Sequence, residues 1–259
     1  MNWAIPIFAG IGAFVIRRST GLGHFGAFMA QSGRALLEVR TWGPILFLQM
    51  RRIGVDSLPI GLFLSAFTGI VLALQASYTF TGAIPLYFVG TLVGKTMILE
   101  LGPVLTGLAL SGRVGANIAA ELGTMRVSEQ IDALETMAYD PVAYLVVPRI
   151  LAGILMFPII VAFANTLGIF SGMITAVNML DMSTQQFIRG LRLFFEPFDV
   201  VYSSIKTMSF GFVVTLIGCY QGFNTQGGAE GVGIATTRAV VTASVLILVL
   251  DAFWAVVLL

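Results

Sequence analysis

Long runs of apolar residues, separated by short polar breaks, dominate the hydrophobic pattern of this chain. A helix that crosses the hydrocarbon core of a membrane needs roughly 20 mostly apolar residues. Five segments reach this length and predict five membrane-spanning helices: residues 57–80, 84–110, 150–180, 201–223 and 239–259. The sequence therefore predicts an all-α, polytopic membrane protein. The second segment also contains Gly102 and Pro103, which predict a kink.

The first 56 residues have a different pattern, in which arginines interrupt shorter apolar stretches. Residues 3–16 are too short to span comfortably, and Arg17 and Arg18 follow them, whereas the charges of a signal peptide precede its apolar run. We therefore expect an interfacial segment that stays in the mature protein. Residues 25–53 mix apolar residues with arginines, which favours a helix in the headgroup layer. We expect one domain, with an interfacial region over 1–56 and a five-span core over 57–259.

The basic residues beside the spans predict the orientation, because cytoplasmic flanks carry an excess of arginine and lysine. With five spans, most of these residues fall on one side: Arg17, Arg18, Arg34, Arg40, Arg51, Arg52, Arg113, Arg126, Arg149 and Arg238. Arg189 and Arg192 fall on the other side. We therefore expect a cytoplasmic N-terminus and a C-terminus on the opposite, periplasmic side.

The composition agrees with a membrane protein and excludes several kinds of site. The chain is 57% hydrophobic and 10% charged, whereas soluble domains carry about 25% charged residues. The formal net charge of +1 gives no indication of a nucleic-acid partner. Cys219 is the single cysteine and His24 the single histidine, so a disulfide framework or a multi-cysteine metal site is excluded. We expect no metal or cofactor on this chain, and Cys219 to be a small apolar residue in a span.

A charged stretch, residues 111–141, interrupts the apolar pattern between the second and third spans. Ser128 is a suitable N-cap, and Asp140-Pro141 would end the helix that it begins. The predicted helix over 128–138 either joins two spans or docks a cytoplasmic partner. Short helices are marginal in water, which favours docking. The candidate docking residues form an apolar stripe and an acidic ridge: Ser128, Glu129, Ile131, Asp132, Leu134 and Glu135, with Ala138 at the end of the stripe.

Four charged residues fall inside predicted spans: Lys95, Glu100, Lys206 and Asp251. A charge in hydrocarbon costs about 2.5–3.5 kcal/mol on insertion scales, so each is a candidate for function. Lys206 and Asp251 lie at similar distances from the outer ends of their spans, and we predict that they form an ion pair. The alternative is that Lys206 extends alone toward the interface. Glu100 either satisfies backbone groups at the kink or lines a cavity.

Small residues recur at helix-contact spacing. Gly90 with Gly94, and Gly168 with Gly172, form G-x-x-x-G patterns that permit close packing of helices. We expect these contacts within one chain rather than between two copies.

Two segments resemble a known family, the MlaE/YrbE-type permeases of ABC transporters that work with MCE-domain proteins. They are "ELGPVLTGLALSGRVGANIAAELGTMRVSEQIDALETMAYDPVAYLVVPR" and, near the end, "ATTRAVVTASVLILVLD". The resemblance covers the chain from about residue 45 onward. It implies a homodimer in the bacterial inner membrane, with the helix over 128–138 seated in a groove of a separate ATPase. It also implies a periplasmic MCE-domain partner, and a small cytoplasmic accessory subunit is a further possible partner.

The resemblance implies that this chain transports rather than catalyses, and the sequence agrees that ATP binds elsewhere. No segment matches the phosphate-binding pattern G-x-x-x-x-G-K-[ST]. In residues 227–237, Gly228 and Gly233 have the spacing, but Ile234 stands in place of the lysine. We therefore expect a flexible turn there, and ATP and Mg²⁺ in the partner ATPase.

The family also places a lipid-accepting cavity between the first two spans and the last. On this sequence the implied phospholipid-binding residues are Leu72, Gln75, Thr79, Phe80, Met97, Glu100 and Leu101. Two other functions remain open. An ion-coupled carrier would use Glu100, Lys206 and Asp251 as a relay without an ATPase, and a membrane scaffold would recruit partners without transport.

Overall fold

The fold is a bundle of long helices, as the apolar pattern predicts. The computed structural model describes residues 23–79, 85–180 and 182–258, and within these ranges it contains helices but no strand. Residues 3–16, including the predicted interfacial segment, lie outside the described residues. Five helical segments are long and apolar enough to cross a membrane: Val39–Ala76, Phe88–Val127, Val142–Met179, Pro197–Phe223 and Gly228–Leu258. The prediction of a polytopic helical membrane protein is confirmed.

The predicted single helix over residues 25–53 is in fact two helices. Residues 23–35 form the first, and α2 spans Val39–Ile53. The chain turns between them, and Trp42 stabilises the turn because its Nε1 donates a hydrogen bond to the carbonyl of Leu36 (3.1 Å). α2 then passes through a 3₁₀ turn at Val55–Ser57 into α3, Leu58–Thr79.

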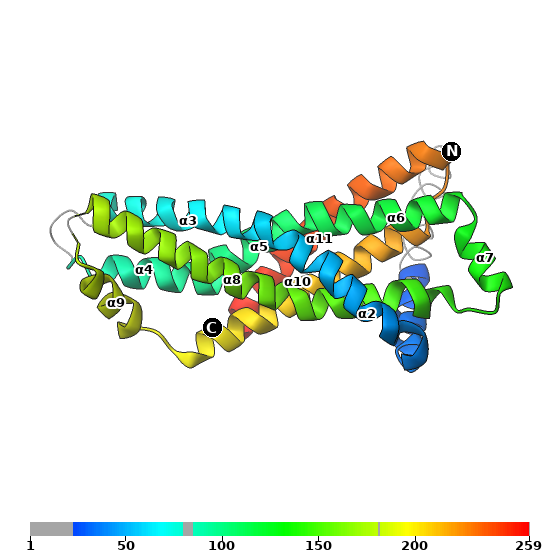
Figure 1. Cartoon of the computed structure of the whole chain (residues 1–259), viewed down its shortest axis with the longest axis horizontal. Coiled ribbons are helices and arrows are strands. Elements are labelled where there is room, and N and C mark those ends of the chain that lie inside the picture. Colours follow the sequence, from blue (N-terminus) through cyan, green and yellow to red (C-terminus); the bar gives the residue numbers. More distant parts are fainter. Residues whose placement is uncertain (1–22, 80–84, 181, 259) are drawn as a thin grey trace, which may run out of the picture.

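The second helical segment continues well past Leu110, where the apolar run ends. It consists of α4 Phe88–Thr96, the π-turn η2 Met97–Leu101, α5 Gly102–Leu110, the π-turn η3 Ser111–Gly115 and α6 Ala116–Val127. α6 extends toward the end of the bundle where α7, Gln130–Thr136, turns away (Figure 1). Glu121 ties α6 to the bundle through Arg52 of α2 (3.2 Å) and Arg149 of α8 (3.0 Å).

The remaining helices complete the bundle. They are the π-turn η4 Val142–Val146, α8 Val147–Met179, α9 Thr184–Leu193, α10 Pro197–Phe223 and α11 Gly228–Leu258. The prediction of a flexible turn over residues 227–237 is wrong, because nearly all of that stretch forms the beginning of α11. Within this stretch only Gly227 precedes the helix, and Gly227 and Gly228 have φ angles of 91° and 67°, which suit glycine.

Close glycine contacts hold the helices together within one chain, as expected for the G-x-x-x-G patterns. A Cβ on Gly69 of α3 would lie 1.9 Å from the carbonyl oxygen of Gly168 in α8. A Cβ on Gly90 of α4 would lie 2.2 Å from the carbonyl oxygen of Phe187 in α9. Backbones therefore touch at both crossings, where a side chain would force them apart.

Two clusters of buried apolar side chains form the core. The larger one joins α2, α6, α8, α10 and α11 and includes Leu122 and Phe210. The smaller one lies between α3, α4, η2, α8 and α9 and includes Met97 and Phe187. The charged groups described next lie where the π-turn η2 meets α10 and α11.

Candidate functional site

Lys206 of α10 forms the centre of a charged cluster inside the helical bundle. Its side chain is completely buried. The Nζ lies 2.5 Å from Oδ1 of Asp251 on α11 and 2.7 Å from Oε2 of Glu100 on η2. The structure therefore contains the predicted Lys206–Asp251 pair and adds Glu100 to it. One ammonium group and two carboxylates connect three spans.

A backbone carbonyl completes the environment of the ammonium group. Lys206 Nζ donates a hydrogen bond to the carbonyl oxygen of Leu99 (3.0 Å). In a regular α-helix this oxygen would accept from the N–H of residue 103, but that residue is Pro103, which has no N–H. The sequence Leu99-Glu100-Leu101-Gly102-Pro103 thus offers a freed carbonyl next to a carboxylate. Lys206 uses both.

The π-turn over Met97–Leu101 places Glu100 in the cluster. Such turns insert an extra residue into a helix and occur frequently at functional sites. Lys206 occupies one carboxylate oxygen of Glu100, yet the Glu100 side chain keeps 40% of its surface exposed in a single chain. Glu100 is therefore both a partner of Lys206 and accessible from outside the chain, whereas Lys206 is not.

A second ion pair lies at the beginning of α10. Lys95 Nζ lies 2.8 Å from Oδ2 of Asp199, whose side chain is almost fully buried. The same carboxylate accepts a hydrogen bond from the backbone N–H of Glu196 (3.1 Å), as part of the capping box that begins α10. Asp199 therefore fixes the start of α10 and joins it to α4.

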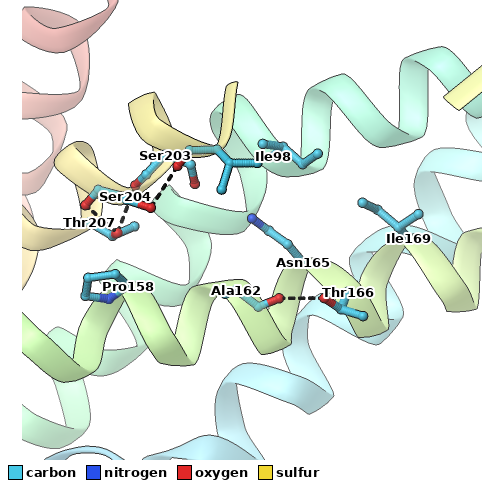
Figure 2. A pocket seen from close by; sticks show the side chains of 10 residues that line it. Ile98, Pro158, Ala162, Asn165, Thr166, Ile169, Ser203, Ser204 and Thr207 are labelled. Carbon is cyan, nitrogen blue, oxygen red and sulfur yellow. Dashed lines mark hydrogen bonds between the residues drawn. The ribbon is translucent and has the colours of Figure 1, made fainter. Parts of the chain in front are cut away.

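A small cavity of about 190 Å³ lies one turn from the cluster, between η2, α8 and α10. Figure 2 shows Asn165 projecting from α8 toward Ser203 on α10, and Thr207 lines the same cavity. The Oδ1 of Asn165 is buried without a hydrogen-bond partner in the described part of the chain. Sequence reasoning missed this residue, although an asparagine in an otherwise apolar stretch is a usable signal.

The residues expected to bind lipid lie in different environments. Met97 is fully buried in the smaller core cluster, so its side chain contributes packing in this conformation. Leu72 and Leu101 are half-buried and pack against the same cluster. Gln75 is exposed. The side chain of Thr79 and the whole of Phe80 lie outside what the structure describes.

The predicted docking helix is shorter than expected. α7 begins at Gln130, not at Ser128, and it ends at Thr136. Ser128 is not an N-cap, because its hydroxyl donates back to the carbonyl of Thr124 (2.7 Å) at the end of α6. Glu129 adopts a left-handed conformation (φ 58°) and makes the sharp turn between α6 and α7. The two helices are therefore separate elements.

The apolar stripe of α7 faces inward. Ile131 is 1% exposed in the larger core cluster, and Leu134 packs against that cluster. Glu129, Asp132 and Glu135 are exposed, and Asp132 pairs with Arg126 (2.5 Å). The expectation that the stripe awaits a partner is thus wrong for Ile131. Exposed apolar side chains occur instead beside the helix, at Val127, Met137 and Tyr139.

Five long apolar helices, joined by ion pairs at Lys206 and Asp199, define a multi-pass membrane protein. Comparison with known proteins specifies the family. A family model described as "Permease MlaE" matches residues 46–257. The chain belongs to the MlaE permease family.

Named relatives cover most of the chain. A probable ABC transporter permease protein of Rickettsia bellii is 38% identical over 239 residues, 92% of each chain. The intermembrane phospholipid transport system permease protein MlaE of Haemophilus influenzae is 34% identical over 235 residues, 90% of this chain and 89% of that one. The chloroplastic protein trigalactosyldiacylglycerol 1 of Arabidopsis thaliana is 36% identical over 203 residues, 78% of this chain and 58% of the relative.

Proposed function

We propose that this chain is the membrane subunit of an ABC transporter that moves phospholipids, as a homodimer in the bacterial inner membrane. ATP hydrolysis takes place in a separate cytoplasmic ATPase. A periplasmic MCE-domain protein exchanges the lipid, and a small cytoplasmic accessory subunit is a further candidate partner. The substrate class is supported by the name of the Haemophilus relative. The coupling to an ATPase is supported by the names of the rickettsial relatives and by the geometry of α7.

The geometry of α6 and α7 carries the proposal. α7 turns away from the bundle at the end of α6, which puts it within reach of a soluble partner (Figure 1). Its outer side offers Glu129 and Glu135, with Met137 and Tyr139 beside them, to that partner. Its inner side is anchored in the core through Ile131. A force on α7 is therefore transmitted directly to the packed spans.

The lipid-binding surface requires a second copy of the chain. Of the most apolar stretch of α11, 11% of the residues are buried, whereas 61% are buried in the third span. This free face of α11 fits lipid and a second copy. Between two copies we place the phospholipid-binding residues Leu72, Gln75, Thr79, Phe80, Met97, Glu100 and Leu101. Met97 becomes accessible in this proposal once α3 and α4 separate.

The charged cluster is the proposed hinge of the transport step. Lys206 connects α10, α11 and the segment that carries Glu100. A movement of α11 is therefore coupled to a movement of the Glu100 carboxylate, which faces the lipid. When the ATPases close and shift α7, the spans rearrange and the cavity between two copies expels its lipid. In this account ATP and Mg²⁺ never touch this chain.

Affinity purification from native membranes in mild detergent tests the proposal, with mass spectrometry of proteins and lipids. Glu135→Arg and Met137→Glu change the outer side of α7 without touching the core. The matched control is Glu38→Arg, an exposed glutamate in the turn before α2. We expect an ATPase and an MCE-domain protein with the wild type and the control, and loss of the ATPase from both α7 variants. A protein that purifies alone, or variants that retain the ATPase, would contradict the proposal.

An ion-coupled carrier is the second candidate function, because Glu100, Lys206 and Asp251 do meet. With two carboxylates and one ammonium group, the cluster has a formal charge of −1 when every group is ionised. A carrier would bind and release a proton or cation there. It would transport without an ATPase and would stop when the ion gradient is removed, which the ABC transporter would not.

A further inference from the structure

A polar cavity of about 280 Å³ lies at a different place, between α2, the 3₁₀ turn that follows it, the π-turn η3 and α6. Its lining residues come from the ends of two spans, and the ones used below are Gln49, Arg52, Asp56, Ser57, Arg113 and Glu121. Glu100 and Arg113 are 13 residues apart on one continuous helix, or roughly 20 Å at 1.5 Å per residue. The cavity is therefore separate from the Lys206 cluster.

One buried polar group in the cavity wall has no partner within the described part of the chain. The Ser57 hydroxyl is buried and makes no hydrogen bond. Gln49, which is 5% exposed, lines the same wall. A buried polar group without a partner costs about 1–3 kcal/mol. The unpartnered Ser57 hydroxyl thus favours a polar guest that can form a hydrogen bond with it.

The charges of the cavity are of two kinds. Arg52 and Glu121 already pair with each other at 3.2 Å. Arg113 and Asp56 form no ion pair with each other or with any other described residue. The cavity therefore offers one free guanidinium and one free carboxylate. That combination matches a zwitterion. A simple anion would leave the Asp56 carboxylate unpaired and would be repelled by its negative charge.

The charge pattern puts the cavity at the level of lipid headgroups. Asp56 is the last charged residue before an uncharged stretch that lasts to residue 94. On the neighbouring segment, Arg113 is the first charged residue after Glu100. Both helices change from apolar to charged at the cavity, and such a change marks the interface between hydrocarbon and headgroups.

We propose that this cavity binds the zwitterionic phosphate-and-ammonium headgroup of a membrane phospholipid of the phosphatidylethanolamine class. Arg113 donates to the phosphate oxygens, because a guanidinium matches phosphate geometry. Asp56 accepts from the ammonium group. The Ser57 hydroxyl and the Gln49 amide supply further hydrogen bonds. Inorganic phosphate shares the first interaction but lacks the second.

Native mass spectrometry of the purified protein tests this site, with phosphatidylethanolamine, phosphatidylglycerol or inorganic phosphate added. Arg113→Gln removes the phosphate contact and Asp56→Asn the ammonium contact. Arg238→Gln is the matched control, because Arg238 is an exposed arginine of α11 that does not line the cavity. Thermal melting checks that each variant folds.

The wild type should retain phosphatidylethanolamine at least about tenfold better than phosphatidylglycerol, equivalent to about 1.4 kcal/mol. Asp56→Asn should abolish this preference and leave phosphatidylglycerol binding in place, and Arg113→Gln should weaken both lipids. The control should behave as the wild type. Equal retention of both lipids by the wild type, or an unchanged preference in Asp56→Asn, would overturn the proposal. Displacement of the lipid by millimolar phosphate would assign the site to a soluble anion instead. Because the experiment measures lipid binding and not transport, its result tests the headgroup site independently of the proposed transport function.

Discussion

Lys206 and Leu99 are joined by a hydrogen bond of 3.0 Å, from the ammonium group of one to the backbone carbonyl of the other. The carbonyl is free because Pro103 cannot donate to it. The helix interruption at Pro103 leaves a carbonyl without a backbone donor, and the buried Lys206 on another span supplies that donor. Because Asp251 and Glu100 bind the same ammonium group, the cluster is the polar link among three spans.

Removal of the ammonium group should destabilise the protein strongly. Lys206→Met leaves two carboxylates and the carbonyl of Leu99 without their donor, and we expect a loss of about 3 kcal/mol, the low end for a broken buried pair because Glu100 is partly exposed. Asp251→Asn should destabilise less. The double variant should be no worse than Lys206→Met alone, measured as thermal unfolding in detergent. Simple additivity of the two effects would argue against the pair.

A methyl group at the crossing of α4 and α9 should be harmful. In Gly90→Ala the new Cβ would lie 2.2 Å from the carbonyl oxygen of Phe187, so the helices must separate. Gly233→Ala is the matched control in α11, where a Cβ would meet nothing within 4 Å. We expect a lower melting temperature for the first and a gain of up to about 1 kcal/mol for the second. Equal effects of the two substitutions would refute the close contact.

Loss of the Asp199 charge should loosen the beginning of α10. Asp199→Asn keeps an oxygen for the backbone N–H of Glu196 but gives up the charge that attracts Lys95. We expect a destabilisation of about 2 kcal/mol, typical of a hydrogen bond to a charged group. Thermal melting of this variant, of Lys95→Met and of the double variant gives the coupling energy, and a coupling of zero would show that the pair contributes nothing.

Substitution of Ile131 should reduce the coupling of ATP hydrolysis to transport without reducing binding of the ATPase. Ile131→Ala opens a space under α7, with a destabilisation of about 2–4 kcal/mol, and leaves the outer side of the helix unchanged. We expect the ATPase to co-purify as before and ATP-driven lipid transport to fall several-fold. Ile159→Ala, at a side chain on α8 that is 44% exposed, is the control. Loss of the ATPase itself, or unchanged transport, would remove Ile131 from the coupling path.

The number and position of the spans could be predicted from the sequence, whereas several of their ends could not. Apolar runs mark the part of a helix that crosses the hydrocarbon core. The helix continues past such a run wherever its backbone hydrogen bonds and its contacts with neighbouring helices permit. α6 continues because Glu121 pairs with arginines of two other helices, and those pairs are invisible in a hydrophobic pattern. The beginning of α11 was predicted as a turn because of its glycines, yet packing against α6 and α10 keeps it helical.

Half of the charged cluster could be predicted. Similar depth was enough to pair Lys206 with Asp251, since depth follows from the rise of a helix. Glu100 was grouped with these two residues only in the ion-carrier alternative, and its ion pair with Lys206 was not predicted, because the direction of Glu100 depends on a π-turn, which changes the angular register of every residue after it. The missing donor of Pro103 was the available signal, and it pointed to the carbonyl of Leu99. The cavity at Arg113 and Asp56 arises only when two distant segments pack together.

Transport by the reconstituted complex tests the central claim most directly. The protein, with its co-purified ATPase and MCE-domain partner, would be placed in liposomes that carry a labelled phospholipid, and transfer to the MCE-domain protein would be measured. We predict transfer that requires ATP hydrolysis and is unaffected when ion gradients are dissipated. Transfer that persists without the ATPase and stops when the gradients are removed would contradict the account and identify an ion-coupled carrier.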